Sequence, residues 1–284
     1  MTDNRRAVLV TGCSSGIGGC VAGGLHARGY RVFATARRRE DVERLAAAGM
    51  ESIQLDVANS SSIEDALGQV LDRTGDCLYG LFNNAGYGQP GAVEDLDRNV
   101  LREQFETNLF GAHELTRRVL PVMRRRGEGR IIQNSSVLGL VVLKFRGAYC
   151  ASKFALEGLT DALRLELRGS GVHISLIEPG PVSSDFRKNA YAAFRMNIDT
   201  ADSAHRAIYA AVEKRLGSED DAGPFTLGPE AVLKKVIHAL ESRRPKARYY
   251  VTAPTHILGF LRRVLPASVL DYVLLKASDA ETKR

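Results

Sequence analysis

The sequence predicts an α/β fold in which a doubly wound, parallel sheet of seven strands carries helices on both faces. Short apolar runs alternate with longer amphipathic stretches from residue 7 to about residue 251. A glycine-rich turn follows the first apolar run, and 44% of the 284 residues are hydrophobic. Alternating strands and helices favour right-handed crossovers, which align the strands in parallel. Because α/β folds of about 250 residues commonly form one domain, we expect residues 1–284 to form a single domain.

The apolar runs and amphipathic stretches define the expected elements. Strands are expected at residues 7–11, 31–36, 52–55, 78–83, 130–135, 172–177 and 247–251. Helices are expected at residues 16–28, 40–48, 61–73, 98–126, 149–169 and 229–241. The third of these helices follows Ser60-Ser61-Ser62, and Glu64 is placed for a capping interaction at its N-terminus.

Two segments depart from this alternation. Residues 184–228 contain Phe186, Tyr191, Phe194, Met196 and Phe225 among Asp, Ser and Gly, with a weak helical pattern near 200–216. An insertion this long is either disordered or a functional lid, and the aromatic content favours a substrate lid. Residues 252–284 are expected to form an amphipathic helical extension, interrupted at Pro266. Its apolar face is formed by Ile257, Leu258, Leu261, Val264 and Leu265, and then by Val269, Leu270, Val273 and Leu274. This face either packs on the domain or on a neighbouring subunit, or it docks on a membrane surface.

Composition excludes several classes of protein. No apolar run approaches the ~18 residues that a membrane span needs. Ala7-Val8-Leu9-Val10 is too short for the apolar core of a secretion signal. The four cysteines (Cys13, Cys20, Cys77 and Cys150) lack CxxC spacing, so they are expected to be reduced thiols in the cytoplasm, and no metal site is expected. The net charge of +6 comes from scattered basic runs, which do not form the stripe typical of nucleic-acid binding.

The glycine-rich turn is the first candidate site. Thr11-Gly12-Cys13-Ser14-Ser15-Gly16-Ile17-Gly18 follows the first strand and opens the first helix. Glycines permit a tight turn and close approach of the backbone to phosphate, and the N-terminus of a helix attracts a pyrophosphate. The GxxxGxG spacing differs from the commoner GxGxxG. Its position after a first strand favours a Rossmann-type dinucleotide site, and the alternative is a purely structural turn.

The end of the second strand indicates which dinucleotide binds. An NAD site usually has a carboxylate there for the ribose 2′-hydroxyl, but this strand ends Thr35-Ala36-Arg37-Arg38. A guanidinium pairs with a 2′-phosphate, so the pattern favours NADP(H) over NAD(H). The alternative is that both arginines are simply exposed at a strand end.

Tyr149 and Lys153 are four residues apart and therefore share one face of a helix. Bringing the pKa of a tyrosine from near 10 to near neutrality requires roughly 4 kcal/mol. A nearby ammonium favours the phenolate, and the positive charge of an oxidised nicotinamide would add to this effect. Tyr149 could then donate a proton in carbonyl reduction or accept one in alcohol oxidation. The spacing alone is weak evidence, since Tyr272 and Lys276 repeat it in the C-terminal extension.

Ser135 and Ser136 end the fifth strand and provide the missing context. In an open parallel sheet, ligands bind at the carboxyl ends of the strands. Ser136 could therefore hydrogen-bond a substrate oxygen and orient it toward the phenol. The alternative is a serine that only caps the strand end.

These residues together resemble the short-chain dehydrogenase/reductase family over residues 7–251. The motifs occur in family order: Thr11–Gly18, Asp56-Val57, Asn83-Asn84-Ala85-Gly86, Asn108, Ser136, Tyr149-Cys150-Ala151-Ser152-Lys153 and Pro179-Gly180. The resemblance implies that Tyr149, Lys153, Ser136 and Asn108 are catalytic, with Lys153 on the nicotinamide ribose and Asn108 anchoring a relay water. It further implies the following cofactor contacts: Gly12, Ser14, Ser15, Gly16, Ile17, Gly18, Arg37, Arg38, Asp56, Val57, Asn84, Ala85, Gly86, Asn108, Tyr149, Lys153, Pro179, Gly180, Val182 and Ser184. Asp56 and Val57 would contact adenine, and Ser184 would lie near the nicotinamide amide. Members that favour NADP often carry a basic residue at the position of Ser15, so that preference rests here on Arg37 and Arg38.

We therefore expect an NADP(H)-dependent oxidoreductase that reduces a hydrophobic aldehyde or ketone, or oxidises the alcohol. Within the family, residues 77–86 and 177–181 look most like the hydroxysteroid and retinol dehydrogenases and the bacterial NADP-dependent aldehyde reductases. The resemblance also implies a homodimer or homotetramer, formed through the helices at 98–126 and 149–169. Two other functions stay open: a sensor that binds NADP(H) without turnover, and a membrane-surface protein built around residues 256–276. The substrate, its stereochemistry and the reaction direction are left undetermined.

Overall fold

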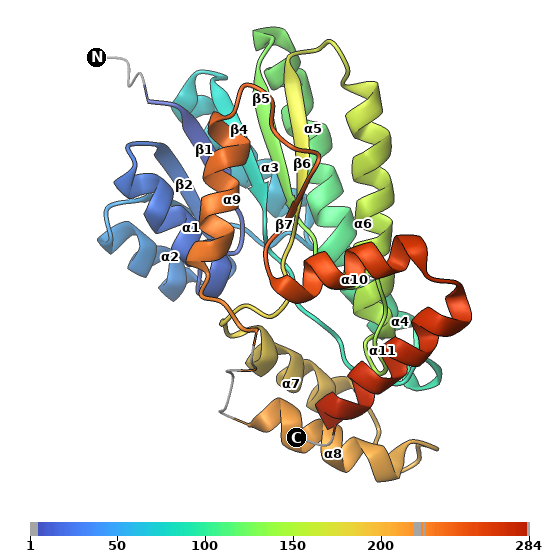
Figure 1. The fold of residues 1–284 in the computed structure, drawn as a ribbon. Helices are drawn as coiled ribbons and strands as arrows, with labels where there is room; N and C mark the ends of the chain where they lie inside the picture. The colour runs from blue at the N-terminus through green and yellow to red at the C-terminus, as the bar shows by residue number, and fades with distance from the viewer. Residues whose placement is uncertain (1–4, 219–222, 224, 283–284) are drawn as a thin grey trace.

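A computed structural model describes residues 5–218, 223 and 225–282. It contains a parallel sheet of seven strands in the order β3-β2-β1-β4-β5-β6-β7, with helices on both faces (Figure 1). The predicted fold class is confirmed. The strands are β1 (Ala7–Val10), β2 (Arg31–Ala36), β3 (Glu51–Gln54), β4 (Leu78–Asn83), β5 (Gly129–Asn134), β6 (Val172–Glu178) and β7 (Arg248–Tyr250). Each predicted strand lies within one residue of the observed one at both ends.

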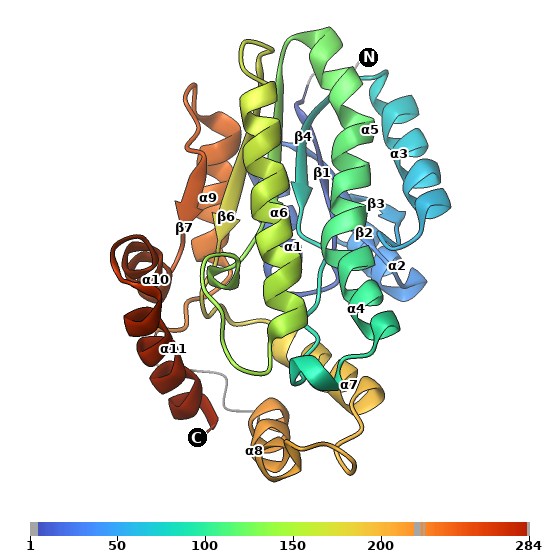
Figure 2. The ribbon, with the colours of Figure 1, turned by 90° about the vertical axis from the view of Figure 1, so that its right-hand side faces the viewer.

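Alternating side chains of the strands enter two separate cores. Val8 and Val10 of β1 pack under α1 (Gly16–Ala27), α2 (Arg39–Ala47) and α9 (Glu230–Glu241). Ala7 and Leu9 face the opposite way, toward α3 (Ser60–Thr74), α5 (Gly111–Arg126) and α6 (Gly147–Glu166), and Figure 2 shows these three helices over that face. Because both faces are covered, β1 is apolar and buried throughout, as is typical of strands in parallel sheets.

The predicted helix 98–126 is interrupted by a π-helical turn. It consists of α4 (Arg98–Phe105), the π turn η2 (Glu106–Phe110) and α5. A Cβ on Gly111 would collide with the carbonyl of Val57, so the glycine lets this bend approach the loop after β3. π turns inside helices are frequent at functional sites, and Asn108 lies in this one.

The predicted cap of α3 is wrong. Asn59 lies one residue before the helix, and its side chain accepts a 3.1 Å hydrogen bond from the N–H of Ser62. Glu64 instead forms an ion pair with Arg118 of α5, at 3.2 Å. Asn59 is a preferred capping residue and precedes the serines, so its side chain, and not that of Glu64, pairs with a free N–H group of the first turn.

The segment 184–228 contains a helix that periodicity did not predict. α7 (Phe186–Asn197) precedes α8 (Arg206–Gly217), which corresponds to the weak pattern near 200–216 but begins later. The two helices share a small core of Ala92, Ala190, Phe194, Ile198, Tyr209, Val212 and Leu216. The apolar face of α7 packs on α8 and on Ala92, so tertiary contacts rather than the local pattern stabilise it. Both helices lie beyond the carboxyl ends of the strands (Figure 2).

The C-terminal extension is helical, as expected, and breaks at Pro266 between α10 (Ala253–Val264) and α11 (Ala267–Thr282). Five leucines of this extension pack against the segment after β5 and the start of α6: Leu258, Leu261, Leu265, Leu270 and Leu274. Ile257 and Val264 are exposed, both at 54%, so the predicted apolar face is divided. Among the described residues, no helix has the length and hydrophobicity needed to cross a membrane. Short 3₁₀ turns at η1 (Val93–Asp95) and η3 (Val137–Gly139) complete the fold.

Candidate active site

The glycine turn forms a cradle of bare backbone between β1 and α1. Gly12 and Gly16 have positive φ angles of 70° and 54°, which favour glycine. A Cβ on Gly12 would lie 2.9 Å from the Cα of Ala85, and one on Gly16 would lie 2.8 Å from the Cβ of Ser184. A Cβ on Gly18 would collide with the carbonyl of Gly12. The turn therefore accepts only glycine at these positions and exposes its backbone to a ligand.

The start of α1 is open to an anion. Ser15 occupies the N-cap position without making a side-chain cap, and the first turn holds no acidic residue. The side chain of Ile17 packs on the core, and the carbonyl of Ser14 accepts a 2.6 Å hydrogen bond from Arg44. The positive end of the helix and its free N–H groups are thus available for a phosphate. This cradle fits the pyrophosphate of a dinucleotide.

Arg37 and Arg38 lie beside this cradle at the end of β2. The N–H of Cys13 donates a 2.7 Å hydrogen bond to the carbonyl of Thr35, which ties the turn to the strand end. Ala36 is buried, whereas both arginines are exposed. In the part of the chain that the structure describes, neither arginine forms an ion pair. The strand end is therefore cationic where an NAD site usually carries a carboxylate.

Asn84 connects the glycine turn to the fifth strand. Its Nδ2 donates to the carbonyls of Thr11 and Gly12 at 2.9 and 3.2 Å, and its Oδ1 accepts from Asn134 at 2.9 Å. The hydroxyl of Thr11 accepts from the N–H groups of Asn84 and Ala85, both at 2.9 Å. This network holds the ends of β1, β4 and β5 at one edge of the sheet.

Asn108 is buried in the π turn, and its side chain holds the loop after β4. Its Nδ2 donates to the carbonyl of Tyr87 at 2.9 Å and to Ser152 Oγ at 3.2 Å, while its Oδ1 accepts from the N–H of Tyr87 at 3.1 Å. A Cβ on Gly86 would lie 3.0 Å from Asn108 Oδ1, so the glycine permits this approach. Both N–H donors of the amide are therefore engaged within the protein.

Ser136, Tyr149 and Lys153 come together at the end of β5. Lys153 is 5% exposed and donates to the carbonyl of Asn134 at 2.7 Å, and its Nζ lies 5.6 Å from the centre of the Tyr149 ring. Ser136 is hydrogen-bonded to Tyr149, and its Oγ accepts from the N–H of Leu138 at 3.1 Å. The ring of Phe186, from α7, meets the ring of Tyr149 edge-on at 5.3 Å. The predicted lid thus contacts the phenol.

Burial shifts the two titratable groups of this trio in opposite directions. It raises the pKa of Tyr149 to about 12, against an opposing effect of the Ser136 hydrogen bond. It lowers the pKa of Lys153 to about 8, opposed by the charge of Glu157. In the protein without its coenzyme, the lysine therefore does not lower the pKa of the tyrosine as expected. The ammonium points at Asn134, and desolvation of the phenolate is the larger effect.

The remaining predicted positions surround the same sheet edge. Asp56 and Val57 follow β3, where Asp56 Oδ1 accepts from the N–H of Ala58 at 3.0 Å. Gly180 follows β6 and packs so closely on Thr252 that a Cβ would collide with the threonine hydroxyl. It lies between Pro179, whose carbonyl accepts from the N–H of Val137 at 2.8 Å, and Val182, which bridges to Leu227.

The competing pair, Tyr272 and Lys276, lies on α11. The Lys276 Nζ is 4.5 Å from the centre of the Tyr272 ring, closer than in the other pair. Tyr272 is 58% exposed, however, whereas Lys153 is buried beside Tyr149. Distance does not separate the two pairs, but burial does. Sequence reasoning also missed Asn134, which accepts from Lys153; its position just before Ser135 and Ser136 was the available signal.

Comparison with known proteins identifies the family. The family model for short chain dehydrogenases matches residues 6–195. The chain belongs to the short-chain dehydrogenase family. It is 44% identical over 270 residues to the oxidoreductase YbbO of Escherichia coli K12, covering 95% of this chain and 94% of that protein. It is 36% identical over 263 residues to human 17-beta-hydroxysteroid dehydrogenase type 1, covering 87% and 78%.

Solved short-chain dehydrogenases share the fold. A short-chain dehydrogenase of Streptomyces avermitilis superposes with a TM-score of 0.77 at 29% identity, covering 100% of this chain and 97% of the other. A family member from Burkholderia phymatum in complex with NAD gives 0.75 at 25% identity, covering 100% and 97%. Actinorhodin polyketide ketoreductase with NADPH gives 0.71 at 29% identity, covering 91% and 98%. Family members thus bind either dinucleotide, and the chain is an oxidoreductase of this family.

Proposed function

We propose that this short-chain dehydrogenase interconverts a hydrophobic carbonyl compound and its alcohol with NADP(H), and that Tyr149 transfers the proton. The observation that carries the proposal is the cluster of buried Ser136 and Lys153 with the partly buried Tyr149, beside the glycine cradle. A bound nicotinamide coenzyme supplies or accepts the hydride in such enzymes. The protein supplies orientation and a proton donor.

Each residue has a distinct part in carbonyl reduction. The hydroxyl of Ser136 binds the substrate oxygen and aims it at Tyr149. The phenol, kept protonated by burial, donates its proton to that oxygen as negative charge develops there. Lys153 stabilises the phenolate that remains and is held in place by Asn134. Because both amide donors of Asn108 are engaged, we assign that residue to holding the Tyr87 loop and leave any water contact to its main chain.

The dinucleotide preference is proposed from the end of β2. The cofactor positions are those of the glycine turn (Gly12 to Gly18), together with Asp56, Val57, Asn84 to Gly86, Pro179, Gly180, Val182 and Ser184. Arg37, with Arg38 beside it, would pair with a 2′-phosphate, and buried Ala36 leaves the strand end without a carboxylate to repel one.

The surroundings of Tyr149 support a hydrophobic substrate. Leu138, Val141 and Leu143 lie in one apolar cluster with Tyr149 and the leucines of α10 and α11. Residues 184–228, with Phe186 against the phenol, would act as the lid of the substrate site. Residues 252–284 would cover the apolar side of that site. Similarity to 17-beta-hydroxysteroid dehydrogenase type 1 favours the same substrate class.

Assembly and location are further parts of the proposal. Exposed apolar side chains gather on α4, the π turn and α6: Leu101, Phe110, Phe154, Leu159 and Leu165. A cavity of about 280 Å³ lies among Arg98, Leu101, Arg102, Phe105 and Phe110. We propose that a second copy covers this face in a homodimer or homotetramer, and that the enzyme works in the cytoplasm. Sedimentation of Leu165→Glu as a monomer would support the interface.

The test of the function is NADPH consumption over a panel of aliphatic, aromatic, steroid and retinoid carbonyls. Turnover is expected with the apolar members of the panel. Tight NADPH binding without oxidation of any carbonyl would favour the sensor instead. The membrane-surface alternative is favoured only by Ile257, Phe260 and Val264 on α10, which are more than half exposed. Equal flotation with liposomes of the full chain and of residues 1–252 would discard it.

A further inference from the structure

A line of four titratable side chains runs along one face of α6. Tyr149, Lys153, Glu157 and Asp161 follow one another at intervals of four residues, so each lies one turn beyond the last. Tyr149 and Lys153 belong to the proposed site. Glu157 is 6% exposed, and it has no assigned part in the reaction although it is the next group along the face.

Glu157 faces a second buried carboxyl group, Glu178, at the end of β6. Glu178 is fully buried, and the two carboxyl groups are close enough to hydrogen-bond to one another. Within the described residues, Glu157 Oε1 and both Glu178 oxygens lack a hydrogen-bond donor of suitable geometry. Two carboxylates cannot hydrogen-bond without a proton between them. Burial raises the pKa of both groups, that of Glu178 to about 9, so the pair holds one proton and one negative charge at neutral pH.

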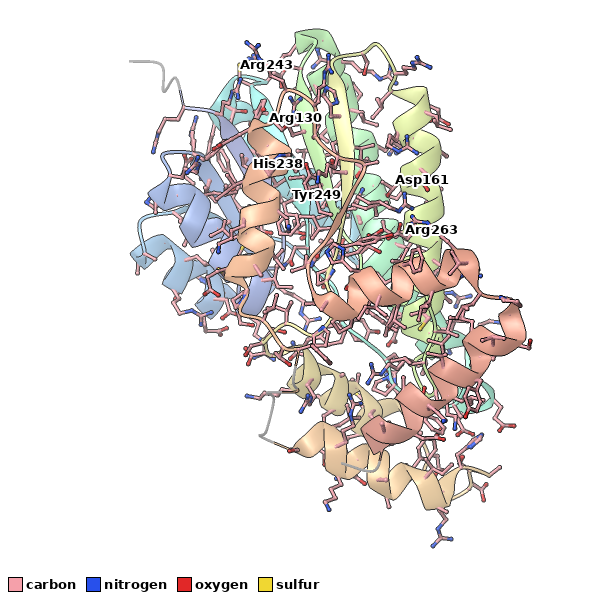
Figure 3. All side chains as sticks on the ribbon, viewed as in Figure 1. Arg130, Asp161, His238, Arg243, Tyr249 and Arg263 are labelled. Carbon is pink, nitrogen blue, oxygen red and sulfur yellow. The ribbon has the colours of Figure 1, made fainter. Side chains whose placement is uncertain are left out.

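Arg248 of β7 fixes this pair from the opposite side. Its Nη2 lies 2.7 Å from Glu157 Oε2, its Nη1 lies 2.9 Å from Asp161 Oδ1, and its Nε lies 3.1 Å from Glu178 Oε1. Arg263 of α10 adds positive charge near Glu178, and Arg164 pairs with Asp161 at 3.2 Å. Figure 3 labels Asp161 on α6 and Arg263 on α10. The Glu157 oxygen nearest Arg248 is therefore held as the charged end of the pair.

The other end of this network reaches the reacting groups. Ser135, next to Ser136, lies beside Glu157: a Cβ on Gly139 would lie 2.7 Å from the serine oxygen and 3.2 Å from Glu157 Oε1. Lys153 donates to a neutral carbonyl, and among the described residues the negative charge of Glu157, one helical turn away, opposes the lowering of its pKa. Glu157 therefore provides the counter-charge for a buried ammonium.

We propose that Glu157 is a positioning residue whose charge, set by Arg248 and by a proton shared with Glu178, keeps Lys153 in the ammonium form beside Tyr149. This inference rests on the proposed function in one respect: the ammonium has a catalytic role only if the protein is the proposed enzyme. The charge relation between Glu157 and Lys153 is a property of the folded protein, and it can be measured without turnover.

The experiment combines an NMR titration of ¹³C-labelled lysine side chains, with Lys153 assigned from Lys153→Arg, and the pH profile of kcat/KM for carbonyl reduction. In Glu157→Gln, the midpoint of Lys153 should fall by about one pH unit, and the alkaline limb of kcat/KM should move by the same amount. Glu157→Asp keeps the charge and should restore most of the shift. A purely structural Glu157 would lower the melting temperature and leave both midpoints in place.

Two further variants complete the test. In Glu178→Gln, the new amide can donate to Glu157, which stays charged, so the Lys153 midpoint should hold or rise; a fall would overturn the proposal even if Glu157→Gln does not fold. Asp161→Asn removes a charge one turn farther from Lys153 and should leave the midpoint unchanged. Equal shifts of the Lys153 midpoint in Asp161→Asn and Glu157→Gln would mean that the overall charge of this region, and not Glu157 in particular, sets the pKa of Lys153. That result would overturn the proposal. Absence of turnover with a shifted Lys153 midpoint would refute the proposed function and leave this inference standing.

Discussion

The buried ammonium of Lys153 donates a 2.7 Å hydrogen bond to the main-chain carbonyl of Asn134. This contact ties α6 to the end of β5, where the reacting groups lie. The contact satisfies one N–H of an ammonium that is 5% exposed. The carbonyl carries no negative charge, so this hydrogen bond offsets only part of the cost of burying the ammonium. The remaining cost of burying the ammonium is the basis of the first prediction.

The stability of the protein should depend on the protonation of Lys153. Burial lowers its pKa from 10.5 to about 8, so between these values the unfolded chain binds more protons than the folded one. The cost of burying the ammonium is therefore full below pH 8 and disappears as the pH rises to 10.5, with an upper limit of about 3 kcal/mol. Urea unfolding of wild type and Lys153→Met should show wild type gaining stability relative to the variant over that interval. A constant difference would mean that Lys153 titrates normally.

Removing the phenol should abolish most of the catalysis and spare the cofactor. In Tyr149→Phe, the ring and its contact with Phe186 are kept, but the proton donor is lost. We expect kcat for carbonyl reduction to fall by about 10²–10⁴-fold, with NADPH binding by fluorescence unchanged. The matched control is Tyr272→Phe, which alters the exposed pair on α11 and should leave kcat unaffected. Full activity in Tyr149→Phe would end the catalytic assignment.

Arg37 should discriminate between the two dinucleotides. Loss of a charge-assisted contact in Arg37→Ala should weaken NADPH binding by about 1.5–3 kcal/mol, or roughly 10- to 150-fold, and spare NADH. Arg39→Ala is the control, since Arg39 is exposed and pairs with Glu43 at 3.0 Å on α2. Calorimetric titration with each dinucleotide measures both affinities. An equal loss for NADH and NADPH would make Arg37 a structural residue.

Two glycines of the same helix should respond oppositely to alanine. Gly18→Ala places a methyl group against the carbonyl of Gly12, so the cradle must deform, and we expect loss of dinucleotide binding and a lower melting temperature. At Gly23, no heavy atom lies within 4 Å of the added Cβ. Gly23→Ala should therefore stabilise α1 by up to about 1 kcal/mol. Thermal melting with and without NADPH separates the effects, and retained binding in Gly18→Ala would refute the cradle.

Features of the fold could be predicted from the sequence when they depend on residues that are close together in the chain. The strands and most helices were predicted to within a few residues, because their apolar periodicity depends only on neighbours in the chain. α7 was missed because its apolar face is stabilised by Tyr209 and Val212, which lie on another helix. The cap of α3 was assigned to the wrong residue because Asn59 and Glu64 both matched capping preferences, and the ion pair of Glu64 with Arg118 could not be seen.

The sequence by itself determined the order of the elements, the glycine turn, the cationic end of β2 and the motifs that place this chain in its family. Each of these features depends on a short stretch of consecutive residues. Only the tertiary structure decided in which of two tyrosine–lysine pairs the lysine is buried, that desolvation raises the pKa of Tyr149, and that Glu157 meets Glu178 beside Lys153. Such properties depend on desolvation and on charges contributed by distant strands, and a linear pattern contains no information about either.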